Sequence, residues 1–270
     1  MYRHFFKRFF DILLSGLALI ILSPLLLIIA ILVRIKHGSP VMFAQYRPGK
    51  DGKIFKFLKF RSMSNKTDKD GYLLPDKDRL TKFGKFLRKT SIDELPQLWC
   101  IFIGKMSIVG PRPRMAEECV FLTDKQQDRF KVRPGITGLA QVNGRNNITF
   151  DKVVEFDKKY VEKITLWGDI KILFLTVIKV FKREGVNKQG TVSNEFYGDY
   201  LLRTKQIEQE YYDQKIKQAR EMILEAKSQK KGSSKEVLYL NGTVNAKDFE
   251  NEEPVAEESK SEEWKQLKEK

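Results

Sequence analysis

The feature that most constrains this chain is an uncharged and almost wholly apolar run at residues 12–33, with Ser23-Pro24 at its midpoint. About 20 apolar residues are enough to span the hydrocarbon core of a bilayer. Lys and Arg residues lie on both sides of the run, whereas the flanks of a spanning helix usually differ in their content of these residues. The two basic flanks therefore favour the same, cytoplasmic side of a membrane.

Proline at the midpoint offers a way for both ends to reach one side. It lacks a backbone N–H and clashes with the carbonyl four residues back, so it kinks or breaks a helix. The Ser23 hydroxyl can satisfy a backbone carbonyl that such a break frees. We therefore predict a re-entrant helix-break-helix hairpin over residues 1–37 and a monotopic membrane protein. One kinked transmembrane helix is the alternative, whereas a cleaved signal peptide is disfavoured by the length of the run.

Charge separates the body of the chain from its C-terminal part. Residues 1–200 carry 36 Lys and Arg against 20 Asp and Glu, whereas residues 201–270 carry 14 against 15. A basic body next to a membrane segment suits anionic lipid and phosphorylated substrates, and the membrane segment argues against nucleic acid. Cys100 and Cys119 fit no disulfide or metal-binding pattern.

The patterns after the membrane segment predict an α/β domain over residues 38–202, mostly helical with a small β-hairpin. Strands are expected at residues 41–46 and 54–60, because a Gly49-Lys50-Asp51-Gly52 turn separates two runs of aromatic and β-branched residues. Helices are expected at residues 80–88, from Ser91 onward, and at 117–130, 150–162 and 169–181. Loops are expected at residues 65–78 and 104–114, and a turn at 133–135.

Two segments have open interpretations. The apolar residues of 169–181 recur at helical spacing, which predicts either a core face or a second, surface-lying membrane contact, and we favour the core. Residues 203–231 are charged and rich in Gln, and we interpret them as a helical extension. Residues 232–270 are acidic and expected to be disordered.

Residues 88–96 carry the strongest chemical pattern. Ser91 and Glu94 match a capping box, which predicts that a helix begins at Ser91. Asp93 then lies in the first helical turn, where the helix dipole favours negative charge. An ionised Asp there can act as a nucleophile or as a ligand of Mg²⁺, which prefers one or two carboxylates plus substrate phosphates. The alternative without a catalytic role is that Asp93 and Glu94 only cap the helix and keep its surface soluble.

Arginines near this acidic pair move the interpretation towards phosphate chemistry. Arg88 precedes the pair, Arg112 lies between two prolines, and Arg145 follows Gly144. Arginine is the side chain best suited to bidentate contacts with phosphate.

Five ordered motifs, together with the apolar hairpin, resemble the small monotopic phosphoglycosyl transferases. These are bacterial polyprenyl-phosphate sugar-1-phosphate transferases, and the chain is similar to the initiating enzyme of Campylobacter-type N-glycosylation. The resemblance covers about residues 1–200. The motifs are Lys59-Phe60-Arg61-Ser62-Met63, Leu87-Arg88-x-x-Ser91-x-Asp93-Glu94-Leu95-Pro96-Gln97, Gly104-x-Met106-Ser107-x-Val109-Gly110-Pro111-Arg112-Pro113, Arg133-Pro134-Gly135-Ile136-Thr137-Gly138 and Gln141-x-x-Gly144-Arg145.

The resemblance implies a reaction at the cytoplasmic face of the bacterial inner membrane. A UDP-sugar donates its sugar 1-phosphate to a polyprenyl phosphate such as undecaprenyl phosphate, with Mg²⁺ as cofactor and UMP as the second product. This is a first membrane step of glycoconjugate biosynthesis. Partners implied are the two substrates and anionic lipid, whereas self-association and contacts with downstream glycosyltransferases stay open. The sequence does not name the sugar.

The resemblance also implies a role for each matching residue. Asp93 is the nucleophile that forms a covalent phosphosugar intermediate and a Mg²⁺ ligand, and Glu94 is the second catalytic carboxylate. Four basic residues contact the phosphates or the nucleotide-sugar, and Ser23-Pro24 forms the break in the membrane helix. These basic residues are Lys59, Arg88, Arg112 and Arg145.

Two other hypotheses differ in the role they give Asp93. In direct transfer through a ternary complex, Asp93 is only a metal ligand. In a non-catalytic membrane scaffold, the basic surface binds lipid and the tail binds partners. The intact acidic pair and the set of arginines argue against the scaffold.

Overall fold

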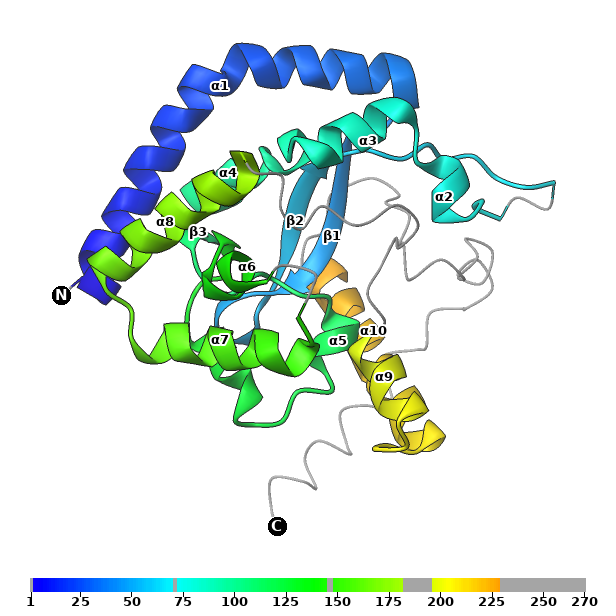
Figure 1. Ribbon diagram of the computed structural model, residues 1–270. Coiled ribbons are helices and arrows are strands. Elements are labelled where there is room, and N and C mark those ends of the chain that lie inside the picture. Colours follow the sequence, from blue (N-terminus) through cyan, green and yellow to red (C-terminus); the bar gives the residue numbers. More distant parts are fainter. Residues whose placement is uncertain (1, 70–71, 145–147, 182–195, 229–270) are drawn as a thin grey trace.

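A long bent helix, α1 (Lys7–His37), carries the apolar run. The computed structural model of the protein describes residues 2–69, 72–144, 148–181 and 196–228 (Figure 1). Figure 1 shows α1 as two arms that meet at a pronounced bend, and Pro24 lies inside this helix. Ser23 donates its hydroxyl to the Ile20 carbonyl at 2.8 Å. The predicted break is therefore a bend within one continuous helix.

The N-terminal arm of α1 is fixed to the globular body by buried polar contacts. Asp11 accepts hydrogen bonds from the Ser107 hydroxyl at 3.1 Å and from the Ile108 N–H at 2.9 Å. Lys7 forms an ion pair of 2.6 Å with Asp169 of α8. A short π-helical turn, Tyr2–Phe6, precedes this arm.

The C-terminal arm of α1 is fixed to the same body by apolar packing and by its last residue. Ile29 and Val33 are buried in a cluster that also contains Phe60 and Leu87. His37 contacts the Arg61 carbonyl through Nδ1 at 3.0 Å. In the described residues α1 is the helix long and apolar enough to cross a membrane, yet both of its ends rest on one globular body.

An antiparallel hairpin forms the centre of that body. Its strands are β1 (Met42–Pro48) and β2 (Ile54–Phe60), and their register pairs Met42 with Phe60 and Pro48 with Ile54. The connection is a turn of 3₁₀-helix at Lys50–Gly52, in which Asp51 has φ 56°. The predicted hairpin is confirmed. Phe55 and Phe57 of β2 pack against Cys100, Ile101 and Met106 in the central core.

A second, parallel pair of strands was not expected. β3 (Ser107–Val109) pairs with β4 (Gly135–Thr137), where the sequence predicted a loop and a turn. Glycine permits the close approach, because a Cβ atom on Gly135 would lie 2.1 Å from the Gly110 nitrogen. The prediction was wrong because this pairing joins segments that are distant in sequence.

Helices surround the hairpin, with α1, α3, α4 and α8 above and to the left of it in Figure 1 and α7, α9 and α10 below. Their bounds are α2 Asp76–Arg79, α3 Lys82–Lys89, α4 Gln97–Phe102, α5 Ala116–Cys119, α6 Leu139–Asn143, α7 Phe150–Glu162, α8 Leu166–Phe181, α9 Tyr197–Arg203 and α10 Gln209–Ser228. The predicted helices at 80–88, 150–162 and 169–181 are confirmed, with small shifts at their ends. Cys100 and Cys119 are both buried thiols.

The predicted helix at 117–130 is wrong. Only α5 and a 3₁₀ segment, η4 (Gln126–Lys131), are helical in this stretch. The residues between them serve two different cores, since Phe121 packs against α9 and α10 and Leu122 packs against Val154. A straight helix could not deliver neighbouring side chains to both places, so tertiary packing overrides helical propensity.

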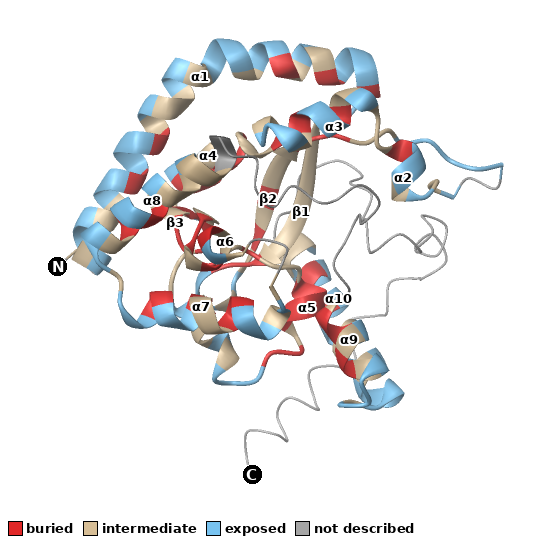
Figure 2. Cartoon of the chain, in the orientation of Figure 1, coloured by how far each residue is buried: buried red, intermediate tan, exposed pale blue. Residues whose placement is uncertain are grey.

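The outer face of α8 is exposed and apolar. Ile170, Phe174 and Val177 are exposed, whereas Ile172 is buried. The expectation that this face belongs to the core is therefore wrong for those three residues. Exposed residues also cover most of α1 in Figure 2, so a large apolar surface is formed by two helices that Lys7 and Asp169 hold together.

The C-terminal extension is partly described. α10 packs against α5 and the hairpin through Ala219 and Ile223, which are buried beside Ala116, Tyr46 and Ile54. The extension thus adds a layer to the body through an apolar contact. Residues 229–231 of the predicted extension, and the predicted tail 232–270, lie outside the described residues.

We expect Ile223→Ala to loosen this layer. Removing the buried side chain should weaken the docking of α10 on the body by roughly 2–5 kcal/mol, because a cavity is left behind. Hydrogen exchange should become faster in α10 and in α5. Leu224→Ala is the matched control, since Leu224 is half exposed. Equal exchange in both variants would contradict the packing described here.

Candidate active site

The acidic pair lies in a short turn between two helices. Asp93 and Glu94 belong to a 3₁₀ turn, Ile92–Glu94, that follows α3 and precedes α4. Ser91 has φ 55° in the left-handed region and its side chain makes no capping hydrogen bond. The predicted helix start at Ser91 is therefore wrong. Pro96 has no N–H to donate into a preceding turn, so the α-helix begins only at Gln97.

Asp93 is buried and has no direct partner among the described residues. Its residue is 6% exposed, and within the described part of the chain its carboxylate makes no hydrogen bond or ion pair. Burial and the neighbouring Glu94 raise the pKa of Asp93, whereas Lys59, Arg88 and Arg112 oppose that shift. The charge of Asp93 thus depends on these cations rather than on a helix terminus, and its oxygens remain available to a ligand.

Glu94 is held by Arg112 in a two-point contact. Arg112 donates from Nη1 to one carboxylate oxygen at 3.2 Å and from Nη2 to the other. Burial alone would raise the pKa of Glu94, but Arg112, Lys59 and Arg47 outweigh it and the pKa is lowered. Glu94 therefore stays ionised at neutral pH. Its partner lies 18 residues further along the chain.

Two more predicted residues face the same pair. Lys59 projects from β2 and lies over the Phe43 ring at 5.0 Å from its centroid. Burial, followed by repulsion from Arg88 and Arg47, lowers the pKa of Lys59 to about 8. Arg88 of α3 donates from Nε to the Ser62 hydroxyl at 2.8 Å.

The loop that carries Arg112 is held through its carbonyl groups. Prolines on both sides of Arg112 have no N–H, so this segment cannot be held as a strand. Instead, the Pro111 carbonyl accepts from the Gly135 N–H at 2.9 Å and the Arg112 carbonyl accepts from Arg129 at 2.6 Å. Arg47 of β1 donates to the Pro113 carbonyl. Three consecutive carbonyls thus each have a partner.

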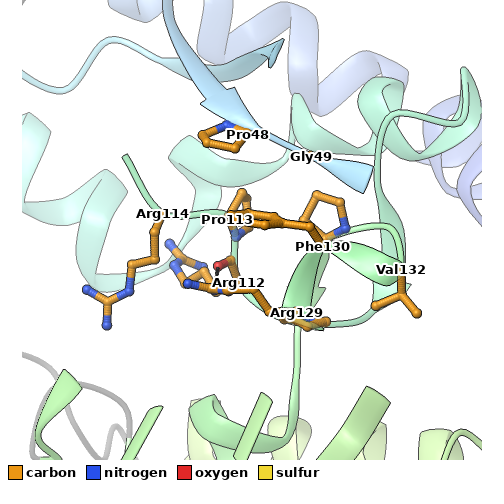
Figure 3. A pocket seen from close by; sticks show the side chains of 10 residues that line it. Pro48, Gly49, Arg112, Pro113, Arg114, Arg129, Phe130 and Val132 are labelled. Carbon is orange, nitrogen blue, oxygen red and sulfur yellow. Dashed lines mark hydrogen bonds between the residues drawn. The ribbon is translucent and has the colours of Figure 1, made fainter. Parts of the chain in front are cut away.

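A small, shallow pocket lies behind this loop (Figure 3). Arg112, Arg114 and Arg129 line it opposite Pro48 and Gly49. Arg47, Arg114 and Arg129 are not among the residues predicted from the sequence. No motif marked them, because their significance comes from burial against distant partners. The pocket shows how the basic side chains gather on both faces of the loop.

The structure therefore brings together Asp93, Glu94, Lys59, Arg88 and Arg112, and Arg145 lies outside the described residues. Cations outnumber the carboxylates, so the site favours an anionic ligand. Among the described residues no group of three or more His, Cys, Asp or Glu could hold a metal ion by itself. The fold and the site thus define a class of protein with a long apolar helix and a site suited to an anionic ligand at a carboxylate.

Comparison with known proteins agrees with this class. The family model for bacterial sugar transferases matches residues 2–183. The chain is 47% identical over 189 residues to the uncharacterized sugar transferase EpsL of Bacillus subtilis, covering 70% of this chain and 94% of that protein. The chain belongs to the bacterial sugar transferase family.

Relatives with named activities are longer proteins. The chain is 46% identical over 186 residues to the UDP-glucose:undecaprenyl-phosphate glucose-1-phosphate transferase of Klebsiella pneumoniae. The match covers 65% of this chain and 40% of that protein. It is 41% identical over 199 residues to the undecaprenyl-phosphate galactose phosphotransferase of Salmonella typhimurium. That match covers 67% of this chain and 41% of the relative. The chain spans about two-fifths of the length of these two relatives.

We expect Lys59 to lose its proton near pH 8, so that a positive charge beside Asp93 disappears as the pH rises through this value. Arg88→Gln removes a repelling charge and should move the midpoint upward. Competitive labelling of amines across pH, with mass spectrometry of the Lys59 peptide, measures it. Arg220→Gln on α10 is the control and should leave the midpoint in place. A midpoint at the ordinary lysine value in the wild type would contradict this account.

Proposed function

We propose that this protein transfers sugar 1-phosphate from a UDP-sugar to undecaprenyl phosphate, giving undecaprenyl-diphosphate-sugar and UMP. The observation that carries the proposal is Asp93, a buried carboxylate that faces Lys59, Arg88 and Arg112 and has no direct partner in the described part of the chain. The activities named for the Klebsiella and Salmonella relatives support it. A scaffold would have no need of a carboxylate that is buried beside three cations, because burying such a group is costly.

The exchange proceeds in two displacements at phosphorus. An Asp93 oxygen attacks the β-phosphorus of the donor, the bond from that phosphorus to the bridging oxygen breaks, and UMP leaves. An oxygen of undecaprenyl phosphate then attacks the same phosphorus and releases Asp93. Two steps mean that the two anionic substrates need not meet, and Arg112 and Arg88 offset the charge that gathers around phosphorus.

Glu94 and Mg²⁺ complete the proposed site. The donor set fits Mg²⁺, since this ion takes one or two carboxylates together with substrate phosphates, and Asp93 has unused oxygens. When bound, Mg²⁺ would neutralise phosphate charge. Arg112 orients Glu94, which can position the metal or remove a proton from the acceptor phosphate. Arg145 is proposed to contact the nucleotide-sugar.

We also propose that α1 is re-entrant and that the protein is monotopic at the cytoplasmic face of the inner membrane. Asp11 and His37 lie near the two ends of α1, and both are fixed to one globular body. A straight helix of 31 residues would separate its ends by about 45 Å, so the bend at Pro24 is what permits this attachment. The exposed apolar face of α8 and the net charge of +15 suit contact with an anionic lipid surface.

The reaction predicts release of UMP by the protein in detergent or nanodiscs, dependent on Mg²⁺, undecaprenyl phosphate and a matching UDP-sugar. Asp93→Asn should reduce the rate by at least about 10³-fold, because the nucleophile is lost. Donor alone should leave a phosphosugar adduct on Asp93, detected by mass spectrometry. Activity in the wild type without any adduct would favour direct transfer, and silence across a broad panel of UDP-sugars would favour the scaffold.

The topology predicts that both ends of α1 can be reached from the cytoplasm only. Arg3→Cys and Lys36→Cys, each made with the native cysteines replaced by alanine, should react with a membrane-impermeant maleimide in inverted vesicles and not in intact spheroplasts. Asn65→Cys in the loop after β2 is the control for the cytoplasmic side. Opposite accessibility of the two ends would show a spanning helix and overturn the re-entrant proposal.

A further inference from the structure

A buried ion pair lies behind the loop that carries Arg112. Arg129 of η4 and Asp157 of α7 approach to 2.9 Å, and each side chain is 2% exposed. The same Nη2 nitrogen of Arg129 donates to the Arg112 carbonyl at 2.6 Å. One guanidinium therefore joins α7 to the backbone of the residue whose side chain holds Glu94.

α7 contacts the loop at a second point. The Arg114 guanidinium lies 5.0 Å from the centroid of the Phe150 ring, in the first turn of α7. Arg114 also pairs with Glu118 of α5 at 3.2 Å. α7 thus contacts Arg114 of the loop through Phe150 and reaches the Arg112 carbonyl through Arg129. Figure 3 shows Arg112, Arg114 and Arg129 on the same side of the pocket.

A charged pair at this depth is not explained by stability. Removing two charges from water costs as much as their attraction returns, and apolar residues of similar volume often stabilise a protein better. Burial raises the pKa of Asp157 to about 6 even though Arg129 and Arg114 oppose the shift. The carboxylate is therefore poorly solvated. What an apolar pair could not supply is a directional donor for the Arg112 carbonyl.

We propose that Asp157 and Arg129 are positioning residues of the transferase, which hold the Arg112 carbonyl and thereby aim the Arg112 side chain at Glu94 and at the phosphates of the donor. The proposal rests on the proposed function. Asp157 attracts the Arg129 guanidinium as an ion pair. Arg129 donates a hydrogen bond to the Arg112 carbonyl, and Arg112 holds Glu94. Neither Asp157 nor Arg129 touches the reacting atoms.

The test is a double-mutant cycle on UMP release. Asp157→Asn keeps the volume of the side chain and removes its charge. Because a displacement of about 1 Å can cost about 10²-fold in rate, we expect kcat to fall roughly 10- to 100-fold while the KM for the donor changes less than about threefold. In an Arg112→Lys background, where the bidentate contact is already lost, the same substitution should change kcat by less than about twofold.

Val154→Ala is the matched control, since Val154 is buried on α7 and packs against Cys119 and Leu122 rather than against the loop. It should lower the melting temperature and leave kcat close to that of the wild type. A fall in kcat in Val154→Ala equal to that in Asp157→Asn would overturn the proposal. So would an equal fractional loss in the wild-type and Arg112→Lys backgrounds, because the effect would then not pass through Arg112.

A second variant and a second readout keep the proposal testable if Asp157→Asn does not fold. Arg129→Lys keeps the charge beside Asp157 but removes the planar guanidinium, and the same dependence on Arg112 is expected. Hydrogen exchange of residues 108–114, the loop itself, requires no turnover and should become faster in either variant, but not in Val154→Ala, whose contacts lie at Cys119 and Leu122. Unchanged exchange in a folded variant would refute the proposal, whereas an inactive wild type would refute only the proposed function.

Discussion

The attachment of both ends of α1 to one globular body is the constraint on which the rest of the structure depends. The N-terminal arm is held by Asp11 and Lys7 through directional polar contacts, and the C-terminal arm by the packing of Val33 and by His37. Such an arrangement requires a bend, and proline is the residue that supplies one without leaving an unsatisfied N–H of its own. Because the same contacts reach β3 and the end of β2, they also place the acidic turn relative to the apolar surface.

The chemistry of the site comes from the different environments of two neighbouring carboxylates, Asp93 and Glu94. Glu94 is satisfied by Arg112 and its pKa is lowered, whereas burial raises the pKa of Asp93, which has no direct partner in the described residues. Adjacent groups of one chemical kind thereby acquire different properties, one fixed and one available. Lys59 and Arg88 keep the available carboxylate in a field that favours its charged form. An anion that enters this field meets the reactive group and its counter-charges together.

Local patterns predicted what local forces decide. Periodicity located α7 and α8, and turn residues located the β1–β2 hairpin, because these elements depend on neighbours in sequence. The Ser91 capping box failed because Pro96 delays the helix and because Glu94 turns towards an arginine 18 residues away. The β3–β4 pair, and the roles of Arg47, Arg129 and Asp157, were missed for the same reason. Each depends on a partner that only the folded chain brings near.

The bend in α1 has a mechanical consequence for the membrane. Each arm, measured from Pro24 to the nearer end of the helix, is roughly 20–25 Å long, which is less than the hydrocarbon thickness of about 30 Å. On the proposed topology the helix and the apolar face of α8 would occupy the cytoplasmic leaflet alone. Every molecule inserted would then enlarge the area of that leaflet without enlarging the other. A crowded array of such molecules would make the bilayer bulge towards the cytoplasm. The curvature of the membrane would then depend on the density of the protein.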